Sequence, residues 1–248
     1  MGFINKKVEF CCKVTNINMV IGTGMIASAF IAYKENNNYV IFASGVSNST
    51  SINQIEFDRE AKLLNNTIFD NLDKKLIYFS TCSIYDDSMI ASPYVLHKLK
   101  MEELITKNHP NFTIFRVSNP IGVTQNKSTF LNYFIEKIKD GTHFEVWANS
   151  YRNIIDIDDM QLACSYIIEN DLQINKIVNI AYPLNYSTQL IIINIENHFN
   201  KKGNYSITNK GSEPKINLDI SKEVLGLLNI NYNDKYLNVL LSKYFPVP

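Results

Sequence analysis

Short apolar runs alternate with longer amphipathic stretches along most of the chain. Apolar runs of this length, bounded by turn residues, are typical of buried strands, and helices between them indicate a mainly parallel sheet. The pattern therefore predicts an α/β protein. The predicted strands are 18–22, 39–44, 75–80, 112–117 and 177–181, and the predicted helices are 26–33, 52–69, 94–107, 129–139, 158–170 and 187–199, with a short one after Ser221.

Helix boundaries are marked by residues that start or stop helices. The polar run 35–38 ends the first predicted helix, Pro93 stands where a helix can begin, and Gly141 closes the helix before it. Glu102 and Glu103 are expected at polar positions of their helix. In the helix at 52–69, the residues expected along one face are Ile55, Ala61, Leu64 and Ile68.

The regular alternation weakens beyond Trp147. We expect one compact unit, in which residues 17–150 build most of the sheet and residues 151–248 form a smaller cap. Residues 1–16 precede the first secure strand, and the stretch 8–14 is either an additional strand or a loose arm. The sequence indicates no function for this segment.

Charge and cysteine content exclude several classes of protein. The 24 Lys and Arg residues balance the 24 Asp and Glu residues, so a nucleic-acid partner is not expected. The four cysteines do not form a disulfide framework, and no Cys or His stands in a zinc-binding spacing, so no metal is expected. The apolar stretch 19–33 is too short to cross a membrane and contains glycines. A cytoplasmic location is the expectation.

A glycine-rich turn joins the first predicted strand to the first predicted helix. Gly22 and Gly24 lack side chains where the backbone turns, and Met25 and Ile26 open the helix, whose N-terminus can face an anion. This context fits the diphosphate of a dinucleotide. Taken alone, it fits an ordinary strand-to-helix turn equally well.

Tyr94 and Lys98 are four residues apart in a predicted helix and therefore share one face. A lysine cation beside a tyrosine can stabilise the phenolate, which makes Tyr94 a usable general acid. The same spacing is common on solvated helix surfaces, so the pair gains meaning only from the motifs around it.

The order of the motifs resembles the extended short-chain dehydrogenase/reductase family, which includes sugar-nucleotide epimerases, dehydratases and ketoreductases. The resemblance begins near residue 18 and continues to the C-terminus. It implies a Rossmann-like, doubly wound parallel sheet in residues 17–150, NAD or NADP as cofactor, and a substrate-side cap in residues 151–248. The segments that carry it are the glycine-rich turn, 42–47, 80–85, 93–98, 116–122 and 152–159.

The same resemblance assigns roles to individual residues. Thr81 would hold the reacting sugar oxygen, Tyr94 would be the acid or base, and Lys98 would bind the nicotinamide ribose. Arg152 would clamp the substrate diphosphate; its alternative role is a surface ion pair with an aspartate in 156–159. The remaining expected cofactor contacts are Gly22, Gly24, Met25, Ile26, Ala43, Ser44, Gly45 and Tyr94, and the remaining substrate contacts are Ser83 and Asn119.

Two departures from the family pattern narrow the prediction. Family dehydratases carry an Asp-Glu pair after the catalytic threonine, but Cys82 and Ser83 stand there, which argues against water elimination. Cys82 is expected to be a small core residue. About one strand–helix–strand unit is missing before 42–45, and no acidic residue or Arg ends that strand to hold the adenosine ribose or its phosphate. Adenosine recognition is then weak or supplied elsewhere, for example by a partner subunit.

The sequence thus favours a ketoreductase that acts on a nucleotide sugar, in deoxysugar or surface-polysaccharide synthesis. An epimerase with tightly bound NAD and a non-catalytic sugar-nucleotide-binding relative stay open as alternatives. The family resemblance also implies a homodimer formed through the helices at 52–69 and 94–107.

Overall fold

The computed structural model describes residues 19–124, 126, 129–230, 233 and 235–247. The predicted N-terminal arm at 1–16, including the alternative strand at 8–14, lies outside these residues. Within the described residues, no helix is long and apolar enough to cross a membrane.

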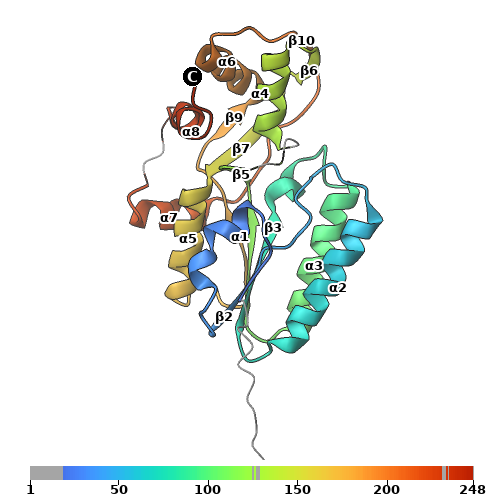
Figure 1. Ribbon diagram of the computed structural model, residues 1–248, viewed down its shortest axis with the longest axis vertical. Helices are drawn as coiled ribbons and strands as arrows, with labels where there is room; N and C mark the ends of the chain where they lie inside the picture. The colour runs from blue at the N-terminus through green and yellow to red at the C-terminus, as the bar shows by residue number, and fades with distance from the viewer. Residues whose placement is uncertain (1–18, 125, 127–128, 231–232, 234, 248) are drawn as a thin grey trace, which may run out of the picture.

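The largest sheet in the described residues has five parallel strands in the order β1-β2-β3-β4-β8. Helices cover both of its faces, which confirms the predicted doubly wound α/β fold (Figure 1). All five strands fall where the sequence pattern predicted them. Their bounds are β1 Val20–Ile21, β2 Tyr39–Phe42, β3 Lys75–Thr81, β4 Phe112–Val117 and β8 Lys176–Ile180.

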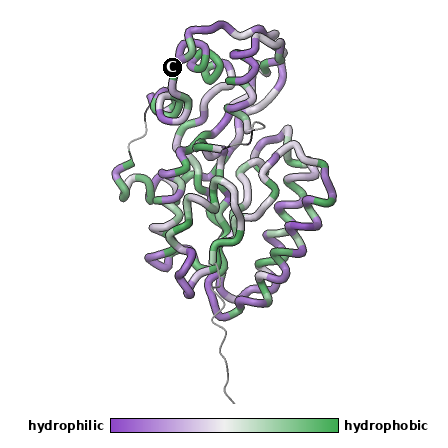
Figure 2. Tube along the Cα trace, in the orientation of Figure 1, coloured by the Kyte–Doolittle hydropathy of each residue, from purple (hydrophilic) through white to green (hydrophobic). Residues whose placement is uncertain are grey.

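Side chains that alternate along the strands build a core on each face of this sheet. On β2, Ile41 packs in the cluster that contains α1 and α5, whereas Val40 and Phe42 pack against α2 and α3. Figure 2 shows the apolar residues concentrated along the central strands. The first face carries α1 (Met25–Ala29), α5 (Ile157–Glu169) and α7 (Asp219–Leu227), and the second carries α2 (Gln54–Asp70) and α3 (Pro93–Asn108).

Strand β1 lies at the edge of this sheet, and β2 follows directly after α1 and the short 3-10 helix Ile31–Tyr33. The chain moves in the same direction across the sheet from β1 to β2 and from β2 to β3, yet α1 and α2 cover opposite faces. These two crossovers therefore have opposite hands, although parallel crossovers are almost always right-handed. The absence of a strand–helix–strand unit between α1 and β2, which the sequence predicted, is consistent with this irregular crossover.

A smaller part of the molecule lies beyond the carboxyl ends of the main strands (Figure 1). The chain after residue 150 also returns to the main sheet, since α5 packs near α1 and β8 pairs with β4. The smaller part contains α4 (Phe130–Asp140), α6 (Thr188–Phe199), α8 (Tyr236–Tyr244), and the sheets β5-β7-β9 and β10-β6, with β5 Asn119–Ile121, β6 Phe144–Trp147, β7 Tyr151–Asp156, β9 Asn185–Ser187 and β10 Tyr205–Thr208.

Three expectations about helices were wrong in detail. The first predicted helix, 26–33, is split into α1 and the 3-10 turn, so α1 is only five residues long. Ile55 is 80% exposed, and the buried face of α2 is formed by Phe57, Glu60, Leu64, Thr67 and Ile68. Glu102 is buried rather than solvated, because it accepts hydrogen bonds from Ser80 and Arg116.

Candidate active site

The predicted site residues gather where the main strands end. The loop after β1 leads to α1 on one face, and the loop after β2 leads to α2 on the other. In open α/β sheets, ligands bind outside the carboxyl ends of the strands, in the crevice between neighbouring loops that lead to opposite faces of the sheet. The strand order does not reverse at β1 and β2, but their loops do lead to opposite faces. The fold thus places the glycine-rich turn and the segment after β2 at that position.

Gly22 can only be glycine in this turn. Its φ of +132° lies in the region that side chains rarely adopt, and a Cβ there would collide with the Ala43 carbonyl. By contrast, a Cβ at Gly24 would meet no atom within 4 Å. The turn is therefore held tightly against β2 on one side and is open at Gly24. Met25 and Ile26 begin α1 and pack, half-buried, on the core.

The segment after β2 contains Ala43, Ser44 and Gly45. Arg59, from the second turn of α2, donates to Ser44 Oγ (3.1 Å) and to the Ser44 carbonyl (3.0 Å). The sequence showed no arginine at the end of this strand, but the fold brings an exposed one there. A Cβ at Gly45 would collide with Lys98 Nζ, so Gly45 lets the backbone approach that ammonium.

Thr81, Cys82 and Ser83 form the end of β3 and the start of the 3-10 helix Cys82–Tyr85. Thr81 Oγ1 accepts from the Ser83 backbone N–H (3.0 Å) and donates to Ser83 Oγ (2.9 Å), which fixes both hydroxyls beside the strand end. Cys82 is buried, donates to the Arg116 carbonyl (3.1 Å), and burial raises the pKa of its thiol. The prediction of a small core cysteine is confirmed.

Tyr94 lies in the first turn of α3. Pro93 occupies the first helical position, and the Ser92 hydroxyl accepts from the Val95 N–H (3.2 Å), so the sequence defines this helix start well. The Tyr94 ring is buried with Val46 and Phe57. No hydrogen bond joins its hydroxyl to another residue in the part of the chain that the structure describes.

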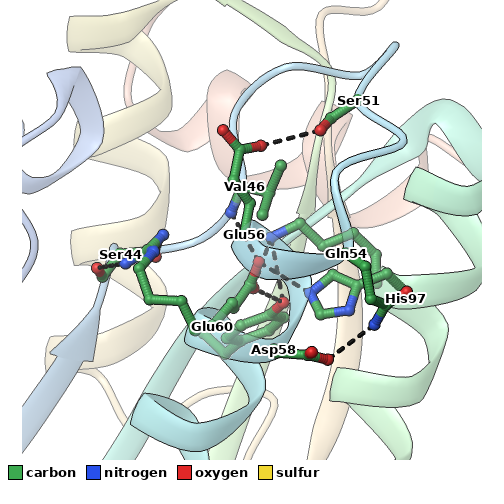
Figure 3. A network of polar contacts seen from close by, with 11 residues as sticks. Ser44, Val46, Ser51, Gln54, Glu56, Asp58, Glu60 and His97 are labelled. Carbon is green, nitrogen blue, oxygen red and sulfur yellow. Dashed lines mark hydrogen bonds and ion pairs between the residues drawn. The ribbon is translucent and has the colours of Figure 1, made fainter.

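Lys98 is buried and turned toward α2. Its ammonium donates to Glu60 Oε1 (2.9 Å) and to the Tyr78 hydroxyl (3.2 Å), and Tyr78 in turn donates to Glu60 Oε1 (2.6 Å). The second carboxylate oxygen, Oε2, lies 3.0 Å from His97 Nε2 and accepts from the Val46 N–H at 2.7 Å (Figure 3). Four groups thus surround one carboxylate, and all of its partners are buried.

The ionisation of Glu60 follows from these contacts. Burial alone raises the pKa of a carboxyl group, but the charge of Lys98 and the hydrogen bonds from His97, Tyr78 and Val46 outweigh it and lower the Glu60 pKa to about 2. Glu60 is therefore a carboxylate at neutral pH. Burial, the Glu60 charge and, to a smaller degree, Tyr94 raise the pKa of Tyr78.

Asn119 and Arg152 lie in the smaller part of the molecule, in β5 and β7. Asn119 Nδ2 donates to the Asn153 carbonyl (2.7 Å). Arg152 pairs with Asp86 (3.1 Å), in the loop that follows Tyr85, and its guanidinium lies over the Phe130 ring. The alternative expectation of an ion pair with an aspartate in 156–159 was therefore wrong.

A crevice of about 290 Å³ opens beside β4 and β8, next to the Tyr85 end of the candidate site. Arg116 and Asn179 line it, and both bond to the Tyr85 hydroxyl. Thr81, Tyr94 and Lys98 do not line this crevice. In the described residues, no cluster of three or more His, Cys, Asp or Glu side chains could hold a metal.

Sequence reasoning missed Glu60 and Arg59. Glu60 recurs with Phe57 and Leu64 at helical spacing, so a charged residue on an otherwise apolar face was the signal that could have revealed it. Arg59 carried no such signal, because its position depends on how α2 packs beside the end of β2.

Comparison with known proteins supports the fold and the motif order. Residues 61–181, from α2 to the end of β8, match the model described as the NAD dependent epimerase/dehydratase family. No curated protein sequence matches the chain. The matched segment contains Thr81, Tyr94 and Lys98, and the resemblance to extended short-chain dehydrogenases/reductases is confirmed.

Solved structures of three enzymes have the same fold. The UDP-glucuronic acid 4-epimerase of Bacillus cereus, in complex with UDP-glucuronic acid and NAD, is 17% identical, with a TM-score of 0.65 over 82% of this chain and 73% of its own. The dTDP-glucose 4,6-dehydratase of Bacillus anthracis, in complex with NAD, is 13% identical (TM-score 0.64; 87% and 74%). The UDP-glucose 4-epimerase of Thermotoga maritima is 18% identical (TM-score 0.59; 80% and 74%).

Proposed function

We propose that the protein is an NAD(P)-dependent enzyme that reduces a keto group on a nucleotide-activated sugar or oxidises the corresponding alcohol. The observation that carries this proposal is the position of Tyr94, whose hydroxyl is uncommitted in the described residues and which lies one helical turn from Lys98. The likeness to NAD-bound sugar-nucleotide enzymes supports it. Deoxysugar or surface-polysaccharide synthesis is the proposed setting.

The residues at the strand ends fit a dinucleotide. Gly24 leaves open space at the turn, and Arg59 adds a guanidinium beside Ser44 that can neutralise phosphate charge. Lys98 has a third N–H beyond its bonds to Glu60 and Tyr78, and in this proposal that N–H donates to the nicotinamide ribose. The bound cofactor would supply or accept the hydride.

The chain's own residues would handle the proton and the charge on oxygen. Tyr94 passes a proton to the sugar oxygen during reduction. Thr81 donates a hydrogen bond to the same oxygen once its hydroxyl proton, which points at Ser83 Oγ in this structure, turns away from Ser83. Arg152, with Ser83 and Asn119, binds the substrate. Because Arg152 already pairs with Asp86, a substrate phosphate would have to share or displace that carboxylate.

Dehydration is not part of the proposal. The side chains that follow Thr81 are a buried thiol and a hydroxyl bonded to Thr81, and neither can move protons as a carboxyl group does. Epimerisation is the second candidate, because two of the three reported structures are 4-epimerases that share this fold. It would use Tyr94 and the same cofactor site without net loss of reduced cofactor.

The test combines purified protein with NADPH or NADH and a panel of keto-sugar nucleotides, and follows the absorbance of the reduced cofactor. Oxidation of the cofactor that is abolished by Tyr94→Phe supports the reductase. Isomerised product with unchanged absorbance identifies an epimerase. Binding of the sugar nucleotide without turnover under either condition refutes the enzymatic proposal and indicates a binding protein. Dimer formation through α2 and α3 stays a prediction, testable by light scattering.

A further inference from the structure

Lys98 has a buried counter-ion that its proposed role does not require. The Glu60 side chain has no exposed surface, that of Lys98 is 3% exposed, and their charged atoms are 2.9 Å apart. A buried ion pair of this kind costs desolvation energy for both partners, so it is weak evidence for a purely stabilising role. A role of Glu60 in controlling Lys98, the lysine beside Tyr94, therefore explains this ion pair better than a stabilising role alone.

The charged and titratable groups around Lys98 come from three elements. Helix α3 supplies Lys98, His97 and Glu102, strand β3 supplies Tyr78, and helix α2 supplies Glu60. Glu102 forms an ion pair with Arg116, whose Nε and Nη2 donate to the two carboxylate oxygens of Glu102 (2.9 and 2.5 Å). His97 and Tyr78 both direct hydrogen bonds at Glu60. Among these groups, the carboxylate that bonds to Lys98 directly is that of Glu60.

We propose that Glu60 is a positioning residue that fixes the Lys98 ammonium and cancels part of its charge at Tyr94. This inference rests on the proposed function of Tyr94 and Lys98. A lysine alone would make the phenol ionise at lower pH, whereas a lysine paired with a carboxylate acts on Tyr94 as a dipole, whose field is weaker. Removal of the Glu60 charge would therefore leave Lys98 acting on Tyr94 as an unpaired cation.

The experiment measures the pH dependence of kcat for reduction in the parent enzyme and in Glu60→Gln. Reduction should slow above a limiting pH at which Tyr94 loses its proton, and this limit should fall by about one pH unit in Glu60→Gln. Glu60→Asp, whose carboxylate is withdrawn by one methylene, should give a smaller shift in the same direction. Glu103→Gln removes an exposed charge from α3 and is the matched control, with an expected shift below ~0.2 unit.

A second measurement does not depend on activity. Tyrosine labelled with ¹³C at Cζ reports phenol ionisation by NMR, and Tyr94→Phe identifies the Tyr94 signal. The Tyr94 phenol should ionise at lower pH in Glu60→Gln than in the parent protein. Glu60→Asp should give a smaller shift in the same direction, and it provides the test if Glu60→Gln does not fold. An unmoved Tyr94 signal in a folded variant overturns the inference. A parent enzyme that turns over no substrate overturns the proposed function instead, while the NMR titration still decides the role of Glu60.

Discussion

The Lys98 ammonium lies 2.9 Å from Oε1 of Glu60, between helices α3 and α2 and above strand β3. This contact links a residue expected to bind the cofactor to the packing of the helix layer. A loss of activity on substitution of Lys98 would thus have two sources, one chemical and one structural. The two can be separated by comparing single and double substitutions.

Lys98→Met should lower the free energy of unfolding by roughly 3–5 kcal/mol, because it leaves the Glu60 carboxylate buried without its cation. Glu60→Gln together with Lys98→Met removes both charges and should lose less than Lys98→Met alone. Urea denaturation of the parent, both single variants and the double variant measures the coupling. Additive losses would contradict the ion pair.

Tyr94→Phe should reduce kcat by about 100-fold or more, since it deletes the proposed proton donor. Its effect on stability should be below ~0.5 kcal/mol, because the ring keeps its contacts with Val46 and Phe57 and the hydroxyl has no hydrogen bond among the described residues. Steady-state kinetics and thermal unfolding on the same preparation test both parts. Unchanged turnover would remove Tyr94 from the mechanism.

The sequence predicted the main sheet well because its signals are local. Strands such as Phe112–Val117 are continuous apolar runs, and α3 begins at a serine cap followed by proline. Strands β6 and β10 of the smaller part were missed because they are short and contain no apolar run. Buried and exposed residues alternate in β6, and the residues of β10 are half-buried or exposed. Helix α8 was also missed; it packs its buried leucines against α6, far away in sequence.

The candidate site was only partly predictable from the sequence. The glycine-rich turn, Thr81 and the Tyr94–Lys98 spacing are motifs within single elements. Glu60 and Arg59 lie on α2, and their roles depend on which residues of β2 and α3 the helix meets. Such contacts between elements have no fixed spacing in the sequence, so the helical pattern could flag Glu60 as unusual but could not identify its partners.

Gly22→Ala and Gly24→Ala should separate folding from cofactor binding. Gly22→Ala forces a side chain into positive φ and against the Ala43 carbonyl, and should destabilise the protein by at least ~1 kcal/mol. Gly24 has an extended conformation with open space around its Cα, so alanine there should be tolerated. If the diphosphate lies against this turn, Gly24→Ala should still weaken cofactor binding. Thermal unfolding and calorimetric titration with NADH measure the two effects, and equal stability of the variants would contradict the geometry.

Arg59→Ala should weaken binding of NADH and NADPH equally, by about tenfold each, because its guanidinium lies beside Ser44 and next to the glycine-rich turn where the diphosphate is expected. Lys62→Ala, which removes another exposed cation from α2, is the matched control and should change neither affinity. A larger loss for NADPH would place Arg59 at the adenosine 2′-phosphate instead. No loss for either cofactor would exclude Arg59 from the site.

Acid should destabilise the parent protein more steeply than Glu60→Gln. The Glu60 pKa falls from its usual 4.5 to about 2 in the folded protein, so the unfolded chain binds this proton first as the pH drops. The stabilisation from ionised Glu60 is therefore complete above about pH 4.5 and is lost as the pH falls toward 2. In that window the free energy of unfolding should fall by up to ~1.4 kcal/mol per pH unit more in the parent than in the variant. Urea denaturation of both proteins at a series of pH values from 6 to 3 gives the two slopes, and parallel curves would show that Glu60 is not held as a buried carboxylate.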